Sequence, residues 1–460
     1  MQQNEMNLYS NVPFGISPEM QKLTHAPYAL KMGRNKQGEI YVKPNIFNIA
    51  QFLRHQDPFK GCIKWDNFAG KVMTSLYHED NDFDVWEDEQ ALRIKHHCID
   101  MYDVDFSLND IHAAALLVAK ENPDNSLLHY LDALTWDGVE RIDNMLHDYF
   151  GVELNDLTRA YSRKTLIAAC ARAFATKRKP VKHDAMLVIY GRQGLRKSTA
   201  LQALCLEKIY DSRYFGDTPI DIKSKDAVMT IQGKLIYEMK ELAKRSKDKL
   251  TEKAWIDHKL DDVRYPYTKH NVQVARKCIF IATTNENQIL TDSTGHRRFW
   301  CVEAGAGWTE DKCIDVETLR ENAPLLWGEA MHYFKKYKTT KDPKYNWWLS
   351  QSLEKLQKED AENYTQEHPL TAAVVDAIEG LCIDKKLMQY TDAPTTAKII
   401  EDLYKEKNPL RESTKYLEKS TRLNQVIISD ILTAKGYKYT RKYIYVGGDL
   451  KTKVQVRGWF

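Results

Sequence analysis

The sequence predicts an α/β protein whose centre is a nucleotide-binding parallel sheet. An apolar run over Met186–Tyr190 stops at Gly191, and the pair Lys197-Ser198 then opens a helix-forming segment. Two further apolar runs, over 233–238 and 278–283, end beside polar side chains. Strands that are buried on both faces of a parallel sheet have this continuous apolar composition. A strand, a glycine-containing turn and a helix in succession are the context that a phosphate-binding loop requires.

The turn after the first strand matches the phosphate-loop pattern G-x-x-x-x-G-K-[ST] incompletely. Gly191, Lys197 and Ser198 are in register, but Arg196 occupies the place of the second glycine. A Cβ at that place is unfavourable if the backbone φ must be positive. The spacing also fits G-x-x-G-x-x-K-S, in which Gly194 makes the turn. The alternative is a chance glycine-containing turn before Lys-Ser in an ordinary α/β domain.

A loop of this kind would bind ATP and Mg²⁺. Its backbone N–H groups and the helix N-terminus face the β-phosphate. Lys197 would reach the β- and γ-phosphate oxygens, and the Ser198 hydroxyl would ligate Mg²⁺. The residues that we predict to bind the nucleotide are Gly191, Gln193, Gly194, Leu195, Arg196, Lys197, Ser198 and Thr199.

Composition limits the class of protein. The 460 residues correspond to about three domains. The formal net charge is +3, so any nucleic-acid surface must be a local feature. Eight scattered cysteines without a C-x-x-C motif argue against a zinc ribbon or a disulfide framework. Because no apolar run approaches the roughly 18 residues of a membrane span, we expect a cytoplasmic protein with no membrane partner.

Residues 1–125 are expected to form an N-terminal α+β region. A helix is predicted over 44–53, a hairpin over 61–72, short strands and turns up to about 105, and a helix over 108–120 that Asn109 caps. We find no catalytic constellation in this region.

Two sets of residues in the N-terminal region could suggest a site. His96, His97 and Cys98 are adjacent, but neighbouring residues on a strand point to opposite faces, so a metal site is not expected. Lys60, Lys64 and Trp65 fit either a DNA-contacting surface or an ordinary half-buried hairpin, and the second reading is favoured.

Residues 126–184 are expected to be a helical segment ahead of the nucleotide-binding core. Residues 129–146 read as a helix, a Trp-Asp-Gly turn and a second helix. From Thr158 to His183 the chain carries many cations and no acidic residue. This basic stretch is either a solvated helix face or a phosphate-contacting surface.

Polar residues near the ends of the two later strands complete the expected site. Glu238 ends the run over 233–238, and Glu241 follows shortly after it. One carboxylate can hold the hydration shell of Mg²⁺ and the other can polarise the attacking water. We assign Glu238 to the metal and Glu241 to the water. Asn285, after the run over 278–283, can hydrogen-bond the γ-phosphate or that water; a pair of surface glutamates and a chance asparagine are the alternatives.

Two features around these strands predict further contacts. Arg297 and Arg298 are unsuited to a core, and one of them can act as an arginine finger in a neighbouring subunit's ATP site; a local salt bridge is the alternative. Residues 261–278 read as a hairpin with a basic tip at Lys269 and His270. Such a hairpin either grips single-stranded phosphates in a ring's pore or merely connects two core strands.

The C-terminal part, 365–460, is expected to be a winged-helix-like domain. Three helices are predicted, over 370–381, 395–406 and 423–434, followed by two strands over 438–446 and 452–458. The strands carry several lysines and arginines, so they either bind DNA or serve a structural role.

Five motifs in this order resemble the virulence-associated protein E family: YLDALTWDGVERID, GRQGLRKST, EMKEL, VRYPY and ATTNENQILTDSTGHRRFW. This family comprises ATPases of phages, prophages and mobile islands that are similar to superfamily 3 helicases and have an AAA+ core. The resemblance covers roughly residues 125–350 and implies an AAA+ superfamily 3-like ATPase over 185–350. It also implies a helical collar and a bacterial host cytoplasm.

By this resemblance, the chain would be a replicative DNA helicase or translocase. It would form a hexamer on single-stranded and forked DNA and move 3′ to 5′, with a primase or initiator as a further partner. Lys269, His270 and Arg264 would contact DNA, and Arg298 rather than Arg297 would be the finger. Two alternatives stay open: an AAA+ initiator or loader that does not unwind DNA, and a DNA-binding module whose phosphate loop is inactive.

Overall fold

The computed structural model describes most of the chain up to residue 364 and shorter segments beyond it. The described residues are 28–77, 82–210, 212–224, 226–240, 254–263, 270–287, 289–290, 296–364, 371, 374–375, 427–429, 431–433, 439–445 and 453–459. The chain divides into two compact units. The first comprises Met1–Lys240, Asp248–Thr283 and Val302–Ser350, and the second comprises Glu241–Lys247, Thr284–Cys301 and Gln351–Phe460.

The first part of the chain combines an antiparallel hairpin and a mixed four-stranded sheet with three helices around one apolar core. The hairpin of β1 and β2 precedes the sheet, in which β5-β4-β3-β6 are neighbours. The strands are β1 (Met32–Arg34), β2 (Ile40–Val42), β3 (Ile63–Asp66), β4 (Lys71–Thr74), β5 (Asp84–Val85) and β6 (Pro123–Asp124). The helices are α2 (Ile46–His55), α3 (Asp88–Tyr102) and α4 (Leu108–Glu121).

The structure confirms the hairpin and the two helices predicted here and corrects two details. Ser107, not Asn109, caps α4, because the Ser107 side chain accepts the N–H of Asp110. Residues 88–102 form α3 instead of strands, because Glu87 and Gln90 make a capping box and apolar residues then recur at helical spacing. His96, His97 and Cys98 therefore lie on a helix.

A five-stranded sheet forms the centre of the first unit, with the strand order β13-β7-β12-β9-β8. β12 pairs with β9 and β8 pairs with β9, both in parallel. After β7 the chain runs to β8 at one edge, returns through β9 and β12, and reaches β13 on the other side of β7. The bounds are β7 (Met186–Tyr190), β8 (Phe215–Gly216), β9 (Ile236–Lys240), β12 (Ile279–Thr284) and β13 (Phe299–Glu303). The mixed α/β class is thus confirmed.

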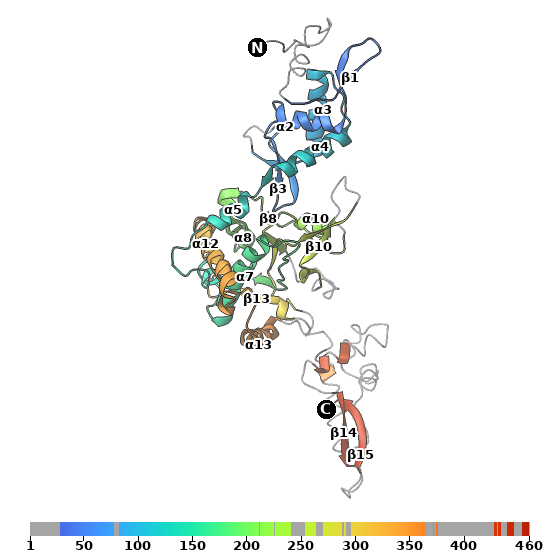
Figure 1. The fold of residues 1–460 in the computed structure, drawn as a ribbon. Coiled ribbons are helices and arrows are strands. Elements are labelled where there is room, and N and C mark those ends of the chain that lie inside the picture. The colour runs from blue at the N-terminus through green and yellow to red at the C-terminus, as the bar shows by residue number, and fades with distance from the viewer. Residues whose placement is uncertain are drawn as a thin grey trace. The chain divides into compact units, whose positions relative to one another are not determined.

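Helices surround this sheet, and α12 contacts both α7 and α8 (Figure 1). The helices are α5 (Ser126–Ala133), α6 (Met145–Phe150), α7 (Asp156–Ala173), α8 (Lys197–Leu204), α9 (Glu207–Tyr210), α10 (Ala227–Ile231) and α12 (Val316–Thr340). Within the described residues, none of the helices has the length and apolar character needed to cross a bilayer.

Several remaining elements lie beside the sheet or in the second unit. β10 (Leu260–Val263) and β11 (Val272–Ala275) form the predicted antiparallel hairpin. α13 (Gln351–Asp360) belongs to the second unit. β14 (Tyr439–Tyr445) and β15 (Lys453–Trp459) are antiparallel, as predicted. The three predicted C-terminal helices fall mostly outside the described residues.

Two cations of the basic stretch, both on α7, are buried and structural, which differs from both predicted interpretations, whereas Lys177, Arg178 and Lys179 after this helix are exposed. Arg172 is 0% exposed and donates to the carbonyl oxygens of Cys278 and His183, each at 2.6 Å. The Nζ of Lys164 donates to the Oδ1 of Asn346 at 2.6 Å and to its carbonyl oxygen at 2.9 Å. Buried cations need such acceptors, so the hydrogen bonds of these two residues fix α7 to neighbouring segments.

A carboxylate on α12 holds the loop that contains the Trp-Asp-Gly motif. Glu329 is 0% exposed, and its Oε2 accepts the N–H groups of Arg141 at 2.6 Å and of Ile142 at 2.9 Å. A Cβ on the preceding Gly328 would lie 3.0 Å from the carbonyl oxygen of Thr135. The close approach of α12 to this loop therefore depends on a glycine and a glutamate side by side. The second predicted helix begins only at Met145, after this loop.

Glu329→Ala should lower the free energy of unfolding by about 3 kcal/mol, since it leaves two buried N–H groups without an acceptor. Glu329→Gln retains a carbonyl oxygen and should cost about 1 kcal/mol or less. Denaturant unfolding measures both values. The exposed Glu321 on the same helix is the control, and its change to Ala should alter stability by no more than about 0.5 kcal/mol. Equal losses of unfolding free energy for Glu329→Ala and Glu321→Ala would contradict the role of Glu329 in holding this loop.

Candidate nucleotide-binding site

The turn between β7 and α8 contains several residues with positive φ. Gly191 has φ 152°, Gly194 has φ 86° and Arg196 has φ 64°, so three residues of the loop have positive φ. Arg196 is the N-cap of α8 in the left-handed conformation. A Cβ on Gly191 would lie 2.6 Å from the carbonyl oxygen of Ala304, so only glycine fits there. Arg196 thus adopts the conformation for which the usual pattern supplies a glycine.

Lys197 is held inside this loop. Its Nζ donates to the carbonyl oxygens of Gly191 at 2.7 Å and Arg192 at 3.1 Å, and the residue is 8% exposed. Burial lowers the pKa of Lys197 below its ordinary value, and the negative charge of Glu238 opposes this shift. The lysine therefore lies within the electrostatic reach of the predicted metal carboxylate.

Glu238 joins the loop to two strands of the sheet. Its Oε1 accepts the hydroxyl of Ser198 at 2.6 Å and the hydroxyl of Thr283 at 2.5 Å. Ser198 is on α8, Glu238 on β9 and Thr283 on β12, where Ile281 is the direct partner of Glu238. The predicted pair of Ser198 and Glu238 is thus brought together. β9 differs from the predicted strand, since it starts at Ile236 and extends two residues beyond Glu238.

These side chains suit Mg²⁺ bound through its water shell. Glu238 is 1% exposed, and its Oε2 has no hydrogen-bond partner among the described residues. A buried carboxylate oxygen without a donor, next to a serine hydroxyl, is a fitting acceptor for metal-bound water. In the sheet, β12 lies between β7 and β9, and ligands of open α/β sheets bind outside the carboxyl ends of the strands.

The other predicted site residues fall into two groups. Glu241, Arg264 and Lys269 lie outside the described residues. Asn285 follows β12 and is exposed, Arg297 is exposed and Arg298 is half-buried at the end of the short helix η2 (His296–Arg298). These three belong to the second unit. His270 is exposed just before β11.

The base of the β10–β11 hairpin is fixed by a buried ion pair that sequence reasoning missed. The Nε and Nη2 of Arg276 donate to the two carboxylate oxygens of Asp261 at 2.9 and 2.5 Å. The guanidinium also lies 4.5 Å from the ring centroid of Trp255. Such a bidentate pair gives geometric specificity. Asp261 faces Val274 in the hairpin register, so the available signal was an arginine two positions beyond the residue that faces the aspartate.

Comparison with known proteins identifies the family. A sequence model of the virulence-associated protein E-like domain matches residues 131–366, which is just over half of the chain. The chain belongs to the virulence-associated protein E-like family. No curated protein matches the sequence of this family member.

Solved structures similar to this virulence-associated protein E-like chain come from the C-terminal region of NrS-1. One apo structure of its A form has 14% identity and a TM-score of 0.45, and the match covers 90% of this chain and 100% of that one. Another apo structure has 14% identity and a TM-score of 0.43, with 85% and 94% coverage.

Arg196→Gly should raise the free energy of unfolding by about 0.5–1 kcal/mol. Glycine avoids the left-handed cost of about 1–2 kcal/mol and loses about 0.5–1 kcal/mol in backbone entropy. Thermal unfolding measures the change. Arg196→Ala keeps a Cβ at positive φ and serves as the control; a gain in that variant equal to that of the glycine variant would show that backbone strain is not the cause.

Proposed function

We propose that this chain is an ATP-driven DNA motor, a helicase or translocase of a phage or other mobile element with an AAA+ superfamily 3-like core. The observation that carries the proposal is the cluster of Ser198, Glu238 and Thr283 directly behind a loop that presents Lys197. Loop, lysine, hydroxyl and carboxylate are the parts that bind and hydrolyse a nucleoside triphosphate. The strand order, with β7 between β12 and β13, supports the same core.

The residues of the loop divide the work. The loop's backbone N–H groups and the N-terminus of α8 bind the phosphates of ATP. Lys197 leaves the carbonyl oxygens of Gly191 and Arg192 and neutralises the β- and γ-phosphate oxygens. Bound Mg²⁺ would supply further neutralisation of phosphate charge, held by the Ser198 hydroxyl and, through its water shell, by Glu238. Glu241 would orient the attacking water, and Asn285 would hydrogen-bond the γ-phosphate or that water.

The proposed motor is a homo-oligomeric ring, and the family's hexamer is the form we favour. Arg298, or its neighbour Arg297, would complete the ATP site of an adjacent subunit. Arg264, Lys269 and His270, which lie between β10 and β11 in the sequence, would contact single-stranded DNA in the pore. The hairpin of β14 and β15 would be the wing of a winged-helix-like domain, in the cytoplasm of a bacterial host.

Lys197→Ala should reduce ATP turnover by about 100-fold or more, since it removes a cation that stabilises the transferred phosphoryl group. Single-stranded DNA should stimulate turnover of the natural protein. Steady-state phosphate release with and without DNA measures both effects. Lys208→Ala, which changes an exposed lysine on α9, is the control and should retain natural turnover. Unchanged turnover in Lys197→Ala would place the nucleotide site elsewhere.

Unwinding of a forked duplex separates the motor from the loader. Strand separation that requires ATP supports the motor. ATP hydrolysis without strand separation would favour an initiator or loader that uses ATP as an assembly switch.

Lys269→Ala should weaken binding of single-stranded DNA and lower its salt dependence. Each lost phosphate contact reduces the slope of log K against log salt by about 0.7 for single strands. DNA titrations at several salt concentrations give the slope, and nucleotide binding should stay unchanged. Lys259→Ala, before β10, is the matched control. An unchanged slope in Lys269→Ala would remove the hairpin from the DNA path.

A further inference from the structure

A second cavity lies in the first unit, away from the phosphate loop. It has a volume of about 390 Å³, within the usual range of ligand pockets. Its walls come from the turn between β3 and β4, the segment after α7, the residues before β9, and β11 with the residues that lead into β12. Gly233 and Cys278 therefore place the cavity at the amino ends of β9 and β12. Glu238 and Thr283 lie in the carboxyl halves of these strands, so the two sites occupy opposite ends of the sheet.

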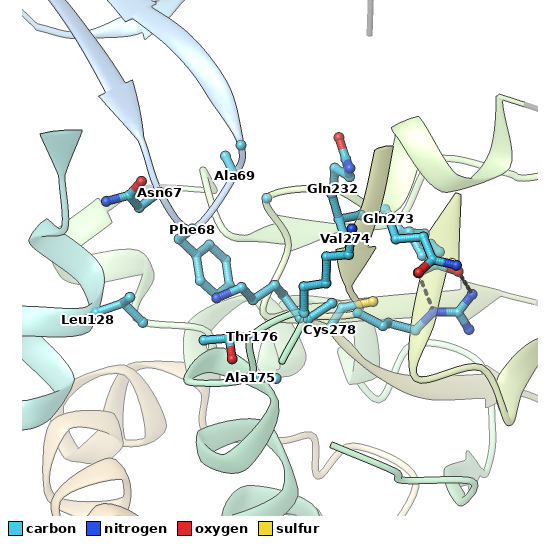
Figure 2. A pocket seen from close by; sticks show the side chains of 18 residues that line it. Asn67, Phe68, Ala69, Leu128, Ala175, Thr176, Gln232, Gln273, Val274 and Cys278 are labelled. Carbon is cyan, nitrogen blue, oxygen red and sulfur yellow. Dashed lines mark hydrogen bonds and ion pairs between the residues drawn. The ribbon is translucent and has the colours of Figure 1, made fainter. Parts of the chain in front are cut away.

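One wall of the cavity is apolar. Phe68 is buried and packs edge-on against Tyr214, with 5.4 Å between ring centroids. Leu128, Ile231 and Val274 add aliphatic surface. Figure 2 shows Phe68 and Val274 around the cavity, with Thr176 and Gln232 among the polar side chains at its border. A planar apolar group can lie against this wall.

The other feature of the cavity is a pair of lysines in its lining, Lys277 and Lys177. The Nζ of Lys277 donates to the carbonyl oxygen of Ala173 at 2.8 Å and lies 5.6 Å from the ring centroid of Phe68. Lys177 also lines the cavity and is exposed. Lys71 and Lys234 directly follow the lining residues Gly70 and Gly233.

Two carboxylates lie near these lysines, and the negative charge of Asp66 opposes the lowering of the pKa of Lys277 and of Lys71. Asp261 is engaged with Arg276 in the buried ion pair. Asp66 uses its Oδ1 to accept the N–H groups of Phe68 and Ala69, at 2.7 and 2.9 Å. Burial lowers the pKa of Lys277 to about 8 and also lowers the pKa of Lys71 and Lys234. An anion against Lys277 would favour the charged form of this amine, which burial disfavours.

We infer that this cavity binds one nucleotide unit, with its phosphate against Lys277 and its base against Phe68. A phosphate ester that carries a planar ring combines the negative charge and the apolar face that the two walls require. The nucleotide could be free or part of a single strand, since both present the same groups. The inference goes beyond the proposed function, because it concerns a second site whose occupancy does not require ATP hydrolysis.

The test uses the full chain with Lys197→Ala and Lys269→Ala, so that neither the phosphate loop nor the hairpin tip contributes. The probes are thymidine monophosphate and a twelve-residue oligo(dT), each followed by titration. Lys277→Met removes the amine, and Ala69→Trp fills the cavity while keeping the amine. Both should weaken binding at least about tenfold, the size expected for loss of one charge-assisted contact. Lys179→Gln, an exposed change outside the cavity, is the matched control and should bind as its parent does.

The two probes separate the sources. Loss of monophosphate binding in both variants indicates a free-nucleotide site, and loss confined to oligo(dT) indicates a unit of a strand. Failure of the parent protein to bind either probe overturns the inference, as does equal binding by all variants.

A second measurement needs no substitution in the cavity. Acylation of lysines at pH 8, read by peptide mass spectrometry, should slow at Lys277 when the probe is bound and stay unchanged at Lys179. Equal labelling of Lys277 with and without the probe also overturns the inference. Absence of ATP turnover in the natural protein would refute the proposed motor. It would not affect the measurement of nucleotide binding in the cavity.

Discussion

The candidate site depends on the carboxylate of Glu238. Its Oε1 receives one hydroxyl from the phosphate-loop helix α8 and another from β12, so one oxygen atom joins three elements. A buried carboxylate is costly unless hydrogen-bonded or compensated by a cation. The two hydroxyls meet part of that requirement, and Lys197 adds positive charge nearby. The geometry of the loop is therefore coupled to the register of β9 and β12.

The elements that were predicted correctly from the sequence are those that depend on local residue patterns. β7, the turn with Lys197 and Ser198, and the hairpins of β3–β4, β10–β11 and β14–β15 are all specified by residues close together in the chain. Thr283 was not found, because its contact with Glu238 arises from the pairing of two strands 45 positions apart. Only a parallel register, which adjacent residues do not encode, brings that hydroxyl to the carboxylate.

The charged residues of α7 show a different limit. A run of cations without acidic residues indicates a surface, yet Lys164 and Arg172 are buried and bind backbone carbonyl oxygens. These acceptors belong to segments far along the chain, at Cys278 and Asn346, so residues near α7 in the sequence do not predict them. Likewise, the shape of the family motif around the Trp-Asp-Gly turn depends on Glu329 on α12, which accepts the N–H groups of Arg141 and Ile142.

The position of the Lys197 ammonium has a consequence for the turnover cycle. Because the amine bonds the loop's own carbonyl oxygens, the loop is folded around an internal cation. An incoming polyphosphate exchanges one set of partners for another, so its net affinity is the difference between the two. If the proposed ATP site is correct, the amine would return to these carbonyl oxygens when the product leaves. The arrangement would then favour rapid exchange of nucleotide over tight retention.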